Sequence, residues 1–203
     1  MSLSAWFKSK TADRVLLPVR EQIGELIEKN SRVLEVGCGT GDLLFRLSGK
    51  IEFGLGLDID TGMIRFANDR LSKEQVANLE FKAARLESLD RVFLGRFNIA
   101  SSTLCLHEME TDDAVSVLSL LRKHVDKIVI ADFDMPDSLW GKISIELDES
   151  ISGHYRRFRK CRSSGGLPNL AARAGLDILS ESRTTIDGVT VWQLGRMPPL
   201  SQV

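Results

Sequence analysis

The chain has 203 residues, which is enough for one domain with a substantial core. Its apolar fraction of 43% and charged fraction of 27% are ordinary for a globular protein, and its formal net charge of −1 argues against a general nucleic-acid binder. We therefore expect a single domain over residues 1–203 that meets any anionic partner only locally.

The three cysteines, Cys38, Cys105 and Cys161, lie far apart and outside any CxxC or Cys/His cluster. This pattern indicates neither a disulfide framework nor a metal site, and it favours a reducing compartment. No stretch approaches the roughly 20 apolar residues of a membrane span, and the N-terminus lacks the pattern of a secretory signal. We predict a cytoplasmic protein with no membrane span.

Strand-like and helix-like stretches alternate along the first two thirds of the chain. Apolar residues recur every three or four positions from Thr11 to Lys29, which predicts an amphipathic helix. Further helices are predicted at 42–47, 61–71 with Thr61 as its cap, and 112–124. Short apolar runs predict strands at 32–36, 53–58, 79–83, 96–101 and 127–132. Because parallel neighbours need crossover connections, this alternation predicts a parallel sheet with helices on both faces.

The pattern changes after Pro136. Helices are predicted at 139–146 and within 163–174, the second ended by Gly175. Strands are predicted at 176–184 and 189–194, and Asp187-Gly188 between them indicates a hairpin. The expected fold class is α/β, a doubly wound, seven-stranded, mostly parallel sheet with a C-terminal antiparallel hairpin.

A glycine-rich loop follows the first strand in the stretch VLEVGCGTGDLL, residues 33–44. Glycines between a buried strand and a helix start let a ligand approach the backbone, and Asp58 after the second strand could bind ribose hydroxyls. The loop and the acid occur together in register, which favours a site for an adenosine ligand. The alternative interpretation is purely structural, a tight strand-to-helix turn followed by an acid that caps a helix. The spacing G-x-G-x-G differs from the G-x-G-x-x-G of dinucleotide sites, but spacing alone is weak support.

VLEVGCGTGDLL followed by GLGLDID resembles the first two motifs of class I S-adenosylmethionine-dependent methyltransferases, of the small-molecule type 11/12. The resemblance extends over FNIASSTLCLHEM, ADFDMP and the final hairpin. It implies a Rossmann-like fold, S-adenosylmethionine as cofactor, and methyl transfer to a small or medium acceptor. By this resemblance Glu35 supports the loop near the methionine end and Asp58 holds the ribose. The residues expected to bind the cofactor are Glu35, Gly37, Cys38, Gly39, Gly41, Asp58, Ile59, Met63, Arg85, Leu86 and Ser101.

The adenine pocket departs from the family pattern. Family members often place an acidic residue after the third strand to accept the adenine amino group, whereas this chain has Arg85 there. Arginine cannot accept a hydrogen bond. We expect adenine to be read by backbone groups of Leu86 or by Glu87.

His107, after the fourth strand, is the first candidate general base, because its unperturbed pKa is near neutral. Its alternative role is that of a polar helix-start residue. A second candidate segment, ESISGHYRRFRKCR at 149–162, concentrates basic and aromatic residues and could bind an anionic acceptor or cover the cofactor. The candidate catalytic residues are His107 and Tyr155, and the candidate acceptor-binding residues are His107, Trp140, His154, Tyr155 and Arg156.

Two other functions remain open. A nicotinamide-dependent oxidoreductase would share the glycine loop and the acid, but it predicts an all-parallel sheet. A catalytically silent subunit could keep the S-adenosylmethionine pocket and work through a partner. The acceptor itself is not readable from the residues, since one fold serves many reactions.

Overall fold

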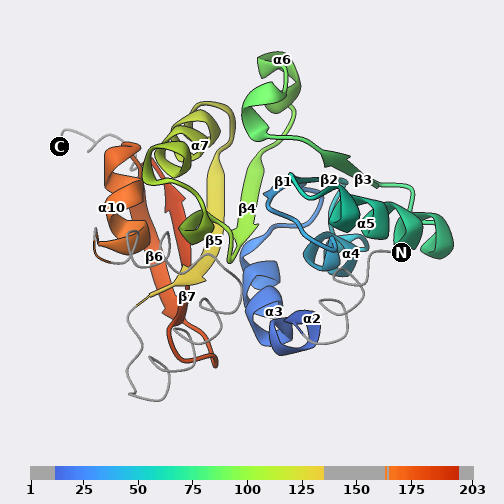
Figure 1. Ribbon diagram of the computed structural model, residues 1–203, viewed down its shortest axis with the longest axis horizontal. Helices are drawn as coiled ribbons and strands as arrows, with labels where there is room; N and C mark the ends of the chain where they lie inside the picture. Colours follow the sequence, from blue (N-terminus) through green and yellow to red (C-terminus); the bar gives the residue numbers. More distant parts are fainter. Residues whose placement is uncertain (1–11, 135–162, 164, 197–203) are drawn as a thin grey trace.

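The computed structural model describes residues 12–134, 163 and 165–196, which form a seven-stranded sheet with helices against it (Figure 1). The strand order is β3-β2-β1-β4-β5-β7-β6. The strands are β1 (Arg32–Val36), β2 (Phe53–Asp58), β3 (Leu79–Ala83), β4 (Ile99–Thr103), β5 (Lys127–Phe133), β6 (Asp177–Arg183) and β7 (Val189–Gly195). Neighbours from β3 to β5 are parallel, whereas β7 is antiparallel to β5 and β6. The predicted fold class is confirmed.

Two apolar layers hold the helices on the sheet, because alternate residues of the central strands face opposite sides. The helices are α2 (Ala12–Val15), α3 (Leu17–Leu26), α4 (Asp42–Leu47), α5 (Thr61–Glu74), α6 (Arg91–Leu94), α7 (Thr111–His124) and α10 (Gly166–Arg173), with short 3₁₀ turns η1 (Leu86–Ser88) and η2 (Leu106–Glu108). Val33 and Val129 pack with α3, α4 and α5, whereas Leu34 and Ile130 pack with α7 and α10. Figure 1 shows α10 beside β6 and α5 beside β3, at opposite ends of the sheet.

The N-terminal helix is interrupted, so the prediction of one continuous helix was wrong. α2 ends at Val15 and α3 begins at Leu17, with Pro18 in its first turn. Proline lacks an N–H and its ring clashes with the carbonyl four residues earlier, so it is tolerated only at a helix start. α3 ends at Leu26, and Ile27 has extended backbone.

Two other boundaries differ from the prediction in ways that affect the site. The fourth strand begins at Ile99, three residues later than predicted, and ends at Thr103. Ser101 therefore lies inside β4 and not at its end. The register of β4 is set by pairing with Val33 of β1 and with β5, a tertiary constraint that the apolar pattern does not contain. Asp60, not Thr61, caps α5, because its carboxylate accepts hydrogen bonds from two backbone N–H groups of the first turn.

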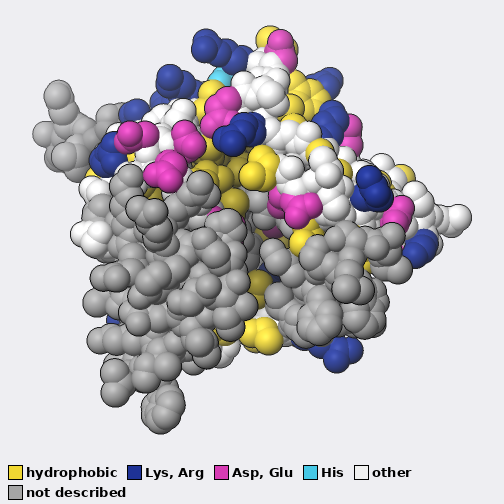
Figure 2. Space-filling model, viewed as in Figure 1, with side chains coloured by type: hydrophobic (Ala, Val, Ile, Leu, Met, Phe, Trp, Pro, Cys, Tyr) yellow, Lys and Arg dark blue, Asp and Glu magenta, His cyan; other side chains and the backbone are white. Residues whose placement is uncertain are grey.

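The helix predicted at 139–146 and the basic segment at 149–162 lie outside the described residues. Among the helices that the structure describes, none combines the length and the apolar character needed to cross a bilayer. Lys and Arg side chains are interspersed with Asp and Glu over the described part of the face in Figure 2.

Candidate functional site

The loop between β1 and α4 is built from three glycines with left-handed backbone. Their φ angles are +72° at Gly37, +52° at Gly39 and +75° at Gly41. A Cβ atom at Gly37 would lie 2.2 Å from Sγ of Cys105, and one at Gly41 would lie 2.4 Å from the Phe81 ring. Within the described residues nothing comes within 4 Å of a Cβ built at Gly39. Internal packing therefore accounts for two of the glycines, and Gly39 leaves room for a ligand.

Asp58, at the end of β2, is bonded to this loop. Its Oδ2 accepts a hydrogen bond of 2.8 Å from the Gly39 N–H, and its Oδ1 accepts one of 2.8 Å from the Asp60 N–H. Each carboxylate oxygen has a second lone pair, so the group can still accept from two hydroxyls. The next residue, Ile59, is 69% exposed and offers an apolar surface beside the acid. Acid and apolar surface together fit a ribose with an attached base.

At the predicted adenine pocket, only some of the residues have side chains that a ligand could contact. The Ala84 N–H donates to the carbonyl of Asp58 over 3.0 Å, which brings the end of β3 next to the acid. The side chain of Arg85 is exposed, whereas Leu86 is buried in the core. Met63 on α5 is also buried. Leu86 can therefore meet a ligand through its backbone alone.

Glu35 on β1 is a buried carboxyl group beside the loop. It pairs in register with Ser101 of β4, and the two are 2% and 0% exposed. Within the described part of the chain, Oε2 of Glu35 and Oγ of Ser101 have no hydrogen-bond partner. Burial raises the pKa of Glu35 to about 8, despite the opposing charge of Arg20.

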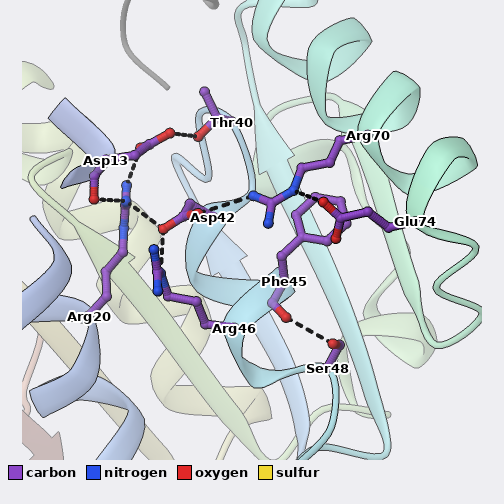
Figure 3. A network of polar contacts seen from close by, with 9 residues as sticks. All are labelled: Asp13, Arg20, Thr40, Asp42, Phe45, Arg46, Ser48, Arg70 and Glu74. Atoms are coloured by element: carbon purple, nitrogen blue, oxygen red, sulfur yellow. Dashed lines mark hydrogen bonds and ion pairs between the residues drawn. The ribbon is translucent and has the colours of Figure 1, made fainter. Parts of the chain in front are cut away.

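An ion-pair network joins the N-terminal helices to the loop (Figure 3). The Arg20 guanidinium lies 2.8 Å from the carboxylate of Asp13 and 2.9 Å from that of Asp42. The Thr40 hydroxyl, in the glycine loop, donates to Asp13 over 2.8 Å. Asp42, the first residue of α4, also receives Arg46 at 2.6 Å and Arg70 at 3.1 Å. Through Asp13 and Arg20 the network holds α2 and α3 against the glycine loop.

His107 and Asp132 form a buried pair at the carboxyl ends of β4 and β5. Nδ1 of His107 lies 2.5 Å from Oδ1 of Asp132, and both side chains are 4% exposed. Asp132 also accepts from the backbone N–H groups of His107 and Phe133. The Phe133 ring contacts the imidazole edge to face at 4.7 Å. These contacts orient the imidazole, with Nδ1 directed to the carboxylate.

Two cysteines, Cys38 and Cys105, lie at the loop. Burial raises the pKa of both the Cys38 and Cys105 thiols well above the usual value. The backbone N–H of Cys38 donates to Leu57, and its carbonyl accepts from Gly41. Cys38 thus helps to shape the loop. Among the described residues there is no group of three or more His, Cys, Asp or Glu placed to hold a metal ion.

The structure brings seven of the predicted site residues to one edge of the sheet. Glu35, the three glycines, Asp58, Ile59 and Ser101 converge there, as the parallel topology requires. The predicted acceptor residues Trp140, His154, Tyr155 and Arg156 lie outside the described residues.

Sequence reasoning did not identify Asp13, Arg20, Asp42 or Asp132 as members of the site. Asp132 could have been predicted from the sequence, because an acid at the end of the buried strand in ADFDMP is unusual unless it has a partner. Arg20 had a weaker signal, a charge inside the apolar stripe of the first helix. Asp13 and Asp42 carried no such signal, since acids near helix starts are common.

The comparisons with known proteins agree with this arrangement. A family model described as a methyltransferase domain matches residues 27–162, more than half of the chain. The ubiquinone biosynthesis O-methyltransferase of Acinetobacter baylyi is 31% identical over 101 residues, which are 49% of this chain and 40% of that protein. The chain spans less than half the length of the curated relatives it matches.

Solved structures share the fold at low identity. A SAM-dependent methyltransferase from Aquifex aeolicus superposes with a TM-score of 0.65 at 15% identity, covering 96% of this chain and 98% of that one. An O-methyltransferase of neocarzinostatin biosynthesis, solved with S-adenosylmethionine and 2-hydroxy-5-methyl naphthoic acid, gives a TM-score of 0.67 at 19% identity, covering 96% and 58%. The chain belongs to the methyltransferase domain family.

Proposed function

We propose that the protein transfers the methyl group of S-adenosylmethionine to a small or medium acceptor and releases S-adenosylhomocysteine. The observation that carries the proposal is the open position at Gly39, whose N–H is bonded to the Asp58 carboxylate. Family membership and the named activities of the relatives support it. The antiparallel β7 between β5 and β6 speaks against the all-parallel sheet expected of a nicotinamide-dependent oxidoreductase.

The residues present fit this cofactor. Asp58 would accept from the ribose hydroxyls, Ile59 would pack against the base, and Glu35 would face the methionine end. The bound cofactor would supply an electrophilic methyl group on a sulfonium. The chain then has to position the acceptor in line with that methyl group and to remove the acceptor's proton.

His107 is the residue that we propose for the proton. The imidazole, oriented by its contact with Asp132, would take the proton from the acceptor. Asp132 would orient the ring and stabilise the imidazolium that forms. This role favours an acceptor that loses a proton on methylation, such as a hydroxyl, which agrees with the named O-methyltransferases among the relatives. Tyr155 and the other acceptor-binding candidates stay predictions.

Titration calorimetry with S-adenosylhomocysteine, and with NAD as the competing ligand, tests the cofactor. We expect binding of the first alone. Asp58→Asn should weaken binding by about 1–3 kcal/mol, because the variant loses a charged acceptor. Asp60→Asn, which keeps the helix cap, is the matched control. Binding of NAD alone would overturn the proposal.

Transfer of a labelled methyl group to a panel of phenols and other small hydroxyl compounds tests the reaction. His107→Gln should lower turnover far more than it weakens S-adenosylhomocysteine binding. Asp132→Asn should lower kcat and alter its pH profile with little change in cofactor affinity, since this residue acts through the imidazole. Full turnover in the His107 variant would remove the base, and cofactor binding without turnover on any acceptor would favour the silent partner subunit.

A further inference from the structure

Glu35, at the carboxyl end of β1, is a buried carboxyl group to which the proposed mechanism gives no role in proton transfer. Glu35 is 2% exposed, and its Oε2 has no hydrogen-bond partner within the described residues. A buried carboxylate whose oxygen has no protein partner is unfavourable, because burial takes away the hydrogen bonds that it makes to water when exposed. Such a group lowers its cost by taking up a proton.

The neighbouring strand adds polar atoms without supplying a charge. Ser101 and Thr103 lie on the same face of β4 as Glu35 does on β1, since Glu35 and Ser101 are in register. Their hydroxyl oxygens are also buried without a partner in the described part of the structure. Together the three side chains form a polar region at this edge of the sheet whose hydrogen bonds the described residues do not complete.

The charges around Glu35 do not hold it ionised. Three carboxylates, Asp13 of α2, Asp42 of α4 and Asp58 of β2, oppose its negative charge. The cation that favours it is Arg20 of α3, but this guanidinium is already bonded to Asp13 and Asp42. The nearby Cys38 thiol stays neutral, because its pKa is raised well above the usual value. Burial together with these acids raises the pKa of Glu35 to about 8.

We infer that cofactor binding at this site is coupled to the release of one proton from Glu35. The inference rests on the proposed function, in which the methionine end of the cofactor lies beside this residue. That end carries an ammonium group, and a cation close to Glu35 stabilises its carboxylate. The proton leaves to solvent as the ammonium binds, so the buried carboxyl gains its missing partner and its charge together.

The sign of the pH dependence follows from this coupling. Below the pKa of the free site the ligand must displace a proton, so its affinity rises with pH by about tenfold per unit. Above about pH 8 the free site is already ionised, and the affinity becomes independent of this group. A site whose carboxylate stayed ionised throughout would show no such rise.

Titration calorimetry with S-adenosylhomocysteine near pH 7, in buffers of different ionisation enthalpy, counts the protons. We expect release of about one proton per ligand in the natural chain and about none in Glu35→Gln. Glu52→Gln, at an exposed glutamate paired with Arg32, is the matched control and should release as many protons as the natural chain. His107→Gln should also keep the count, which excludes the imidazole as the source.

Each outcome has one meaning. Tight binding without proton release, or release that persists in Glu35→Gln, overturns the inference and leaves the proposed function standing. Absence of binding at every pH contradicts the proposed function itself. Should Glu35→Gln not fold, the natural chain and His107→Gln decide, because a flat affinity profile between about pH 6 and 8 in both overturns the coupling.

Discussion

Replacing Arg20 by methionine should destabilise the fold strongly, because this guanidinium joins two buried carboxylates. The side chains of Arg20, Asp13 and Asp42 are 9%, 10% and 8% exposed, so water screens them little. Breaking a buried pair by removing one partner costs about 3–5 kcal/mol. Asp42 keeps Arg46 and Arg70, which places the expected loss of unfolding free energy near 3 kcal/mol. Asp13 keeps the Thr40 hydroxyl and becomes the least satisfied group.

Urea unfolding measures this loss, and thermal unfolding should show a decrease in Tm of roughly 6–12 °C for a chain of this size. The matched control is Arg173→Met, which removes the ion pair with Asp112, whose side chains are 43% and 90% exposed. Exposed pairs contribute about 0–1 kcal/mol, so the control should change stability little. If Arg20→Met were no more destabilising than the control, the reasoning about the buried network would be refuted.

Three further changes test other parts of the structure. Gly37→Ala should lower the unfolding free energy by roughly 2–5 kcal/mol, because the φ angle at Gly37 is +72° and the added Cβ would meet Cys105. Gly49→Ala is the control and should be nearly neutral, since a Cβ there meets open space. Equal urea midpoints for the two variants would contradict this. The stability that protonated Glu35 contributes is complete below its unfolded pKa of 4.5 and is lost as pH rises through about 8. Glu35→Gln should therefore gain stability relative to the natural chain over that pH range, by at most about 1.4 kcal/mol per unit of pKa shift. Parallel pH profiles of Tm for the two proteins would count against this. Leu118→Ala in α7, fully buried, should cost about 2–5 kcal/mol in urea, and a loss below about 1 kcal/mol would mean that α7 packs loosely.

The sequence by itself determined the class of fold, most element positions and the glycine-rich loop between β1 and α4. β1, β2 and β3 were predicted at their observed residues, since each is a short apolar run bounded by turn or helix signals. Gly37, Gly39 and Asp58 were singled out because a glycine turn and an acid at this spacing are local features of the sequence; that they bind the cofactor stays a prediction. The hairpin at Asp187-Gly188 was readable for the same reason.

Only the tertiary structure decided which polar groups share an environment. Asp132 and His107 are 25 residues apart, and Arg20 and Asp42 are 22 apart, so no local pattern joins them. The register of β4 with β1 placed Ser101 beside Glu35, and the tertiary packing removed both from water. Charge state depends on that burial, because the cost of an ionised carboxyl is set by the atoms around it and not by its position in the chain.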